Sequence, residues 1–184
     1  ICRKDDDYYI AVSSFEWFPG IPVYHSRDMK NWELYTHVLT DDETVDLKKL
    51  PSSKGIWAPC LTWCESENLF YVVYGVMNSM NAGYFEVDNY LITASDIKGP
   101  WSEPVYLHSA GFDASILHDD DGRKYIVSLE WETREGYEKP GVISMSEYNP
   151  VKKEIIGYPK HIWRGGTNRG CIEAPHLYKK NGYY

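Results

Sequence analysis

The sequence lacks the features of several common classes of protein. It has no apolar run of membrane-spanning length, no Asn-x-Ser/Thr sequon and no sustained helical periodicity. Its 19 lysines and arginines are outnumbered by 27 aspartates and glutamates, so the formal charge is −8. A phosphate-binding surface needs the opposite balance. We therefore expect neither a nucleic acid nor a membrane as a partner.

Cysteines are also scarce. Four of them, Cys2, Cys60, Cys64 and Cys171, are too few and too scattered for a disulfide scaffold. The Cys60-x3-Cys64 pair has no second pair at ligand spacing, which argues against zinc. The sequence therefore predicts free, mostly buried thiols and no metal site.

Aromatic residues, by contrast, are abundant. They make up 15% of the chain, with 16 tyrosines and 7 tryptophans, and hydrophobic residues as a whole make up 43%. This composition provides ample core material and favours sheets over helices. Flat aromatic rings also stack well on the C–H faces of pyranose sugars, so the composition suits a neutral carbohydrate substrate.

An internal repeat organises the chain. Trp57, Asp113 and Glu173 each open a short apolar stretch, which a polar turn joins to a second apolar or aromatic stretch. The first two positions are 56 residues apart and the last two are 60 apart. Residues 1–12 fit the later part of the same pattern. Each unit holds two hairpins, or about four strands.

Four-stranded units at this period are typical of β-propeller blades, so we expect an all-β fold. The chain would cover about three blades and the start of a fourth. It ends on Tyr183-Tyr184, where a strand has just begun, so we expect a piece of a longer protein. The predicted blades are about 1–50, about 56–108, about 112–165 and, for the start of the fourth, about 172–184.

The first position of each unit is the main candidate for chemistry. Equivalent positions of successive blades gather round the propeller axis, which would bring Trp57, Asp113 and Glu173 to one mouth of the channel. Carboxylates at an aromatic-walled pocket are the groups that glycoside hydrolysis uses. The plainer alternative is that the two acids cap strand ends. Their equivalent places in the repeat favour the catalytic interpretation.

Four motifs together resemble glycoside hydrolase family 43, and most closely its β-xylosidases. They are SFEWFPG at 14–20, GIWAP at 55–59, GFDAS at 111–115 and EAPHLY at 173–178. The likeness runs along almost the whole chain and implies a five-bladed propeller, an inverting mechanism and three essential acids. One departure is Ala174, where the family motif usually has glycine, and we expect this change to be tolerated.

The resemblance assigns roles to single residues. Glu173 matches the general acid, and Asp113 matches the third carboxylate, which orients the acid and raises its pKa. Phe15, Trp57 and Trp131 match aromatic walls of the sugar site, Trp131 in the looser part of the alignment. The family's general base is an aspartate, and its matching position lies just upstream of Ile1, outside the sequence. Residues 1–184 alone are therefore expected to be inactive.

The resemblance also implies what lies outside these residues. The rest of the propeller and a C-terminal β-sandwich would follow Tyr184. No cofactor is required for the chemistry, although the resemblance allows a structural calcium ion on the axis of the full-length protein. The compartment stays open, with a slight preference for the cytoplasm, because any signal peptide would precede Ile1.

The expected activity is release of terminal xylose from β-1,4-xylo-oligosaccharides, or from arabinoxylan-derived substrates. An α-L-arabinofuranosidase or arabinan-degrading enzyme of the same family is the nearest alternative. A non-catalytic sugar-binding propeller is less favoured. A sialidase-type propeller is disfavoured, because residues 26–32 only partly match an Asp-box. The sequence does not indicate an oligomeric state.

Overall fold

The computed structural model describes residues 1–81, 84–131, 141–166 and 172–184. Within these residues the regular structure is entirely β, and no helix is long and apolar enough to cross a membrane. The strands are β1 (Cys2–Lys4), β2 (Asp7–Ala11), β3 (Gly20–Ser26), β4 (Glu33–Leu39), β5 (Gly55–Cys64), β6 (Leu69–Asn81), β7 (Tyr84–Ala94), β8 (Val105–His108), β9 (Phe112–His118), β10 (Lys124–Glu130), β11 (Val142–Asn149) and β12 (Glu154–Trp163).

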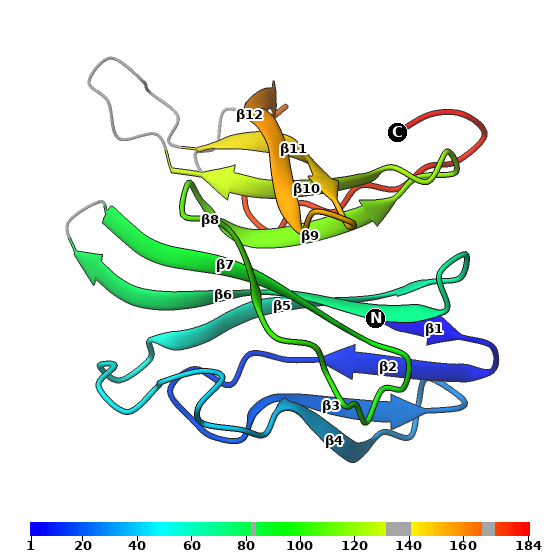
Figure 1. The fold of residues 1–184 in the computed structure, drawn as a ribbon, viewed down its shortest axis with the longest axis vertical. Helices are drawn as coiled ribbons and strands as arrows, with labels where there is room; N and C mark the ends of the chain where they lie inside the picture. The colour runs from blue at the N-terminus through cyan, green and yellow to red at the C-terminus, as the bar shows by residue number, and fades with distance from the viewer. Residues whose placement is uncertain (82–83, 132–140, 167–171) are drawn as a thin grey trace.

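The strands form three separate four-stranded antiparallel sheets, each in chain order. The first holds β1 to β4, the second β5 to β8 and the third β9 to β12. Figure 1 shows the sheets stacked along the long axis, with the second between the other two. The first strands are neighbours, since β5 contacts both β1 and β9. This is the arrangement of propeller blades around an axis, and the prediction of an all-β fold built from four-stranded units is confirmed.

Short polar turns make the hairpins. Between β9 and β10, the N–H of Asp119 donates to the carbonyl of Arg123 at 2.9 Å, and Gly122 adopts a left-handed φ of 85°. A similar turn joins Lys180 and Tyr183, with Asn181 and Gly182 both left-handed (φ 51° and 80°). Two left-handed residues are what a tight two-residue hairpin turn requires, and here the turn closes with a single bridge.

One expected strand is missing. The start of the fourth blade was expected to open with a strand after Glu173, but among residues 172–184 the structure has only the bridge between Lys180 and Tyr183. Pro175 has no N–H to donate to a strand ladder. Its carbonyl oxygen accepts a hydrogen bond of 2.5 Å from the Ser115 hydroxyl rather than from a neighbouring strand. This segment is therefore attached to β9 by side chains rather than by a sheet.

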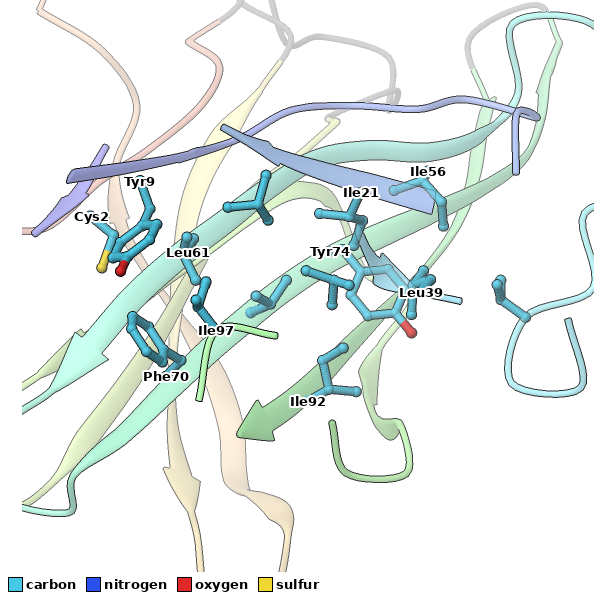
Figure 2. Close-up of a cluster of buried hydrophobic side chains, with 14 of the residues drawn as sticks. Cys2, Tyr9, Ile21, Leu39, Ile56, Leu61, Phe70, Tyr74, Ile92 and Ile97 are labelled. Carbon is cyan, nitrogen blue, oxygen red and sulfur yellow. The ribbon is translucent and has the colours of Figure 1, made fainter. Parts of the chain in front are cut away.

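The hydrophobic cores lie between sheets. One cluster joins the first sheet to the second, as Figure 2 shows for Tyr9, Ile21 and Phe70 among others. Two further clusters lie between the second and third sheets, one around Tyr71 and Ile116 and one around Phe112 and its neighbours. Burial of such side chains contributes about 1.5–3 kcal/mol each. Face-to-face packing of the sheets therefore holds the blades in place.

A lysine also crosses each seam. Lys4 lies over the ring of Trp63, with Nζ 4.2 Å from the ring centroid. Lys124 is 2% exposed, and its Nζ lies 2.8 Å from a carboxylate oxygen of Glu67. Lys179 pairs with Asp119 at 2.5 Å. Each lysine thus adds a charged contact to the packing at its seam.

The cysteine prediction is confirmed for the described residues. Cys2, Cys60 and Cys64 are free and buried. Cys171 lies outside the described residues. In the part of the chain that the structure describes, no three histidine, cysteine, aspartate or glutamate side chains are grouped so that they could hold a metal ion.

Candidate active site

A pocket of about 410 Å³ opens where the three sheets meet the segment after β12. Two of the residues around it are the carboxylates Asp113 and Glu173, and most of the others are apolar or aromatic. The pocket brings together residues from five parts of the chain, namely the link after β2, β5, the β6–β7 hairpin, β9 and the segment 172–184. The lining residues are Ser13, Phe15, Trp57, Ala58, Met80, Phe85, Phe112, Asp113 and Glu173.

Asp113 lies near the start of β9 and is half-buried. Its Oδ2 accepts a hydrogen bond of 3.0 Å from the backbone N–H of Ala174. Burial raises the pKa of Asp113, the hydrogen bond from Ala174 opposes that shift, and the negative charge of Glu173 adds to it. Glu173 is therefore close enough for its charge to affect the ionisation of Asp113.

Glu173 precedes the anchored residues of the segment after β12. Its side chain is exposed at the pocket, while Ala174 is held by Asp113 and Pro175 by the hydroxyl of Ser115. Figure 1 shows this segment, in red, running beside the third sheet. The acid is thus presented to the pocket by a backbone fixed at two points, and its carboxylate stays accessible.

Phe15 and Trp57 form the opposite wall. Their ring centroids are 6.4 Å apart and the rings meet at 77°, an edge-to-face contact. Phe15 exchanges two backbone hydrogen bonds with Ile56, of 3.0 and 2.9 Å, so the link after β2 is joined directly to β5. The structure therefore brings four of the predicted residues, Phe15, Trp57, Asp113 and Glu173, into one pocket.

Trp131 has a different position. It packs on Phe85 and Phe112, with ring centroids 5.1 and 6.5 Å away, and is not among the lining residues. We expected Trp131 to form a wall itself, and in this structure it packs against Phe85 and Phe112, two of the aromatic residues that line the pocket. The sequence places Trp131 two positions beyond Leu129 of β10, but it does not show that Phe85 and Phe112 lie between Trp131 and the pocket.

Sequence reasoning missed several lining residues. Met80 and Phe85 form a register pair on the β6–β7 hairpin, whose strands are 13 and 11 residues long. The matching strands of the third sheet, β10 and β11, have 7 and 8 residues. The longer spacing between the two strands' apolar parts, with Met80 and Phe85 between them, was the available signal for a hairpin that reaches the pocket. Phe112 could have been found as the direct neighbour of Asp113.

Several non-glycine residues at or beside the pocket have a left-handed backbone. Phe15, Ala58, Asp113 and Ala174 have φ values of 53°, 40°, 55° and 50°. For residues with a Cβ this conformation costs about 1–2 kcal/mol each. Such strain persists where the surrounding structure fixes it, and it is common at functional sites. Ala174 is thus strained at the position where the family motif usually has glycine.

The groups that line the pocket are of the kinds that acid-assisted cleavage of a neutral glycoside uses. Aromatic faces offer apolar contact to a sugar ring. A protonated carboxyl group can donate its proton to a glycosidic oxygen, and a second carboxylate can orient that acid. Among the described lining residues there is no lysine or arginine to pair with an anionic substrate. The geometry therefore favours acid-assisted cleavage of a neutral glycoside.

Comparisons with known proteins agree with this chemistry. The model of the family described as glycosyl hydrolases family 43 matches residues 1–184. A β-xylosidase of Bacillus subtilis is 45% identical over 184 residues, which are all of this chain and 34% of that protein. A xylosidase/arabinosidase of Humicola insolens is 42% identical over the same length and also 34% covered.

A solved structure shows the same fold. The crystal structure of a xylan β-1,4-xylosidase from Bacillus halodurans superposes with a TM-score of 0.92 and 44% identity. The match covers 98% of this chain and 34% of that one. The chain thus spans about a third of the length of these relatives, and the shared part includes the candidate active site.

Proposed function

The chain belongs to glycoside hydrolase family 43, and on that premise we propose that it is part of an inverting β-xylosidase. The family consists of five-bladed propellers, and this chain forms part of one. The observation that carries the proposal is that Asp113 and Glu173, 60 residues apart, line one pocket with Phe15 and Trp57. The predicted blade limits, with residues 172–184 opening a fourth blade, are part of this proposal.

In the proposed reaction, Glu173 is the general acid. Its exposed carboxyl group donates a proton to the glycosidic oxygen as the bond to the leaving sugar breaks. Asp113 orients that acid through its hydrogen bond to the next residue, Ala174. Phe15 and Trp57 hold the terminal sugar by contact with its apolar faces.

An inverting reaction also needs a carboxylate that activates water from the opposite side of the sugar. We propose that this base is supplied by residues outside 1–184, because the repeat places the equivalent position just before Ile1. Acid and base must stand about 6.5–9.5 Å apart to leave room for the water. The proposal therefore applies to the complete polypeptide that carries these residues.

The proposed substrate is a short β-1,4-linked xylo-oligosaccharide. The relatives named β-xylosidase support xylose, and the relative named xylosidase/arabinosidase supports α-L-arabinofuranosides as the second candidate. Both sugars are neutral pentoses of similar size. A pocket of about 410 Å³ accommodates either one at its aromatic wall.

Proton NMR of early turnover tests the proposal. The complete polypeptide should release xylose from xylobiose, and the first product should have the inverted α configuration. A panel of aryl β-xylosides and α-L-arabinofuranosides then ranks the two substrates by kcat/KM. A retained β product would overturn the mechanism, and a lack of turnover on every pentoside would overturn the function.

A further inference from the structure

The hydrogen bonds around Trp57 extend away from the pocket. The indole N–H of Trp57 donates to the carbonyl oxygen of Ser53 at 3.1 Å. Ser53 lies in the link 40–54 between β4 and β5, which contains no strand, and its own φ is left-handed at 65°. The orientation of the indole therefore depends on a residue that the sheets do not hold.

Glu16 provides the anchor for Ser53. Its Oε2 accepts the backbone N–H of Ser53 at 3.0 Å, across 37 positions of sequence. Hydrogen bonds from the N–H groups of Glu16 itself and of Ser53, together with Lys54, hold the pKa of Glu16 below its ordinary value. The side chain is thus an anion at neutral pH, and hydrogen bonds to an anion are stronger than neutral ones.

The same two segments meet again beside this contact. Phe15 pairs with Ile56, and the N–H of Ala58 donates to the hydroxyl of Ser13 at 2.9 Å. A Cβ at Gly55 would lie 2.2 Å from the carbonyl oxygen of Phe15, so the backbones can approach this closely only with glycine there. Residues 13–16 and 53–58 therefore form one hydrogen-bonded unit behind the aromatic wall.

We propose that Glu16 is a positioning residue, which fixes the Trp57 indole through Ser53 as the platform for the terminal sugar. This inference rests on the proposed function, because it assigns Trp57 to the sugar. Glu16 does not line the pocket and touches no substrate in this proposal. Glu16 instead fixes the orientation of the Trp57 indole before the sugar binds, so it preorganises the site.

The alternative is that Glu16 only attaches the link 40–54 to the first sheet. A purely structural anchor would change stability and leave sugar affinity unaltered. Removal of a positioning residue instead raises KM, because the indole loses its fixed orientation. It has little effect on kcat, because Glu173 and Asp113 are untouched. The two roles are therefore separable by experiment.

The experiment uses three variants of the complete polypeptide. Glu16→Ala removes the acceptor, Glu16→Gln keeps an oxygen that can accept from Ser53, and Glu43→Ala is a control at an exposed glutamate of the same link. On an aryl β-xyloside, Glu16→Ala should raise KM about fivefold, the effect of one net hydrogen bond, with kcat within about twofold. Glu16→Gln should restore most of the affinity, and Glu43→Ala should match the unmodified protein.

Binding of xylose, followed by tryptophan fluorescence, separates this inference from the proposed function. Glu16→Ala should weaken xylose binding in the protein that has Trp57 and leave it unchanged in a Trp57→Phe background. An equal weakening in both backgrounds, or a lower melting temperature with unchanged KM, would overturn the positioning role. If the protein binds xylose but hydrolyses no glycoside, the proposed function fails while this coupling can still be measured.

Discussion

The backbone N–H of Ala174 donates to Oδ2 of Asp113 at 3.0 Å, which ties the residue after Glu173 to a carboxylate 61 positions earlier. One oxygen of Asp113 is thereby used to hold the backbone that carries the acid. The charge of Glu173 in turn raises the pKa of Asp113, in addition to the larger effect of burial. The contact thus fixes the backbone beside Glu173, and the charge of Glu173 affects the ionisation of Asp113.

The first prediction concerns Asp113→Asn. The amide oxygen can still accept from Ala174, so the backbone of the acid should stay in place, but the negative charge is lost. We expect activity on xylobiose to fall roughly 10²-fold, within the range for proton-transfer assistance. At neutral pH the melting temperature should rise, because the folded protein no longer has to hold a half-buried carboxylate in its charged form.

The pH dependence of that gain follows from the raised pKa of Asp113. Between the ordinary and the raised value, the folded state binds more protons than the unfolded state, so stability falls as pH rises through this window. The advantage of Asp113→Asn should therefore be present at neutral pH and vanish in acid. Asp5→Asn is a matched control, since Asp5 has a similar φ of 54° but is exposed. A gain that persists unchanged in acid would contradict this account.

The second prediction concerns Glu173→Gln. Removing the acid should slow hydrolysis of xylobiose by roughly 10²–10⁴-fold. The loss should be much smaller for aryl xylosides with activated leaving groups, because these groups depart without protonation. Steady-state kcat/KM on both substrates measures the difference. Equal losses on the two substrates would show that Glu173 is not the acid.

The repeat made the main features of this fold and site predictable. Asp113 and Glu173 occupy equivalent places in successive units, and packing of equivalent units around an axis brings such places together. The polar turns with Asp-Gly and Asn-Gly fixed the hairpins, because their left-handed conformations are accessible to few residues. The pocket residues Asp113, Glu173 and Trp57 follow from period and turn chemistry alone.

Other features depend on contacts that have no counterpart in the repeat. Met80 and Phe85 reach the pocket because β6 and β7 extend beyond the strands of the neighbouring sheets. Trp131 was expected at the sugar site, but its depth behind Phe112 depends on how three rings pack, which spacing does not encode. The contact of Glu16 with Ser53 spans a link of irregular structure, for which sequence patterns give no register.

The third prediction concerns Gly111, two residues before Asp113. A Cβ there would lie 2.1 Å from the carbonyl oxygen of Leu129, a backbone atom that cannot move aside. Gly111→Ala should destabilise the protein by at least about 1–3 kcal/mol and should lower activity by displacing Asp113. Urea unfolding and kcat/KM on an aryl xyloside measure the two effects.

Gly166→Ala is the control for this substitution. Neither glycine has a left-handed φ, and among the described residues the closest contact of a Cβ at Gly166 would be an ordinary 3.5 Å to Trp163. This variant should therefore be close to neutral in stability and activity. If both substitutions had the same effect, the close approach of β9 and β10 would not be what fixes Asp113.

The last prediction concerns the buried ion pair between the second and third sheets. Lys124 is 2% exposed, and its Nζ lies 2.8 Å from Glu67, which also accepts from the hydroxyl of Tyr71. Burial acts to raise the pKa of Glu67, but the contacts with Lys124 and Tyr71 outweigh it and lower that pKa. Lys124→Met removes the cation and leaves a partly buried carboxylate unpaired, so the free energy of unfolding should drop by about 3–5 kcal/mol.

The double variant Lys124→Met with Glu67→Gln should recover part of that loss, because neither charge of the pair is then left. Urea titrations of the complete polypeptide measure both variants. If the double variant lost as much free energy of unfolding as the two single variants added together, charge pairing would not be the contribution of Lys124. Its packing against Tyr71 would then be the contribution.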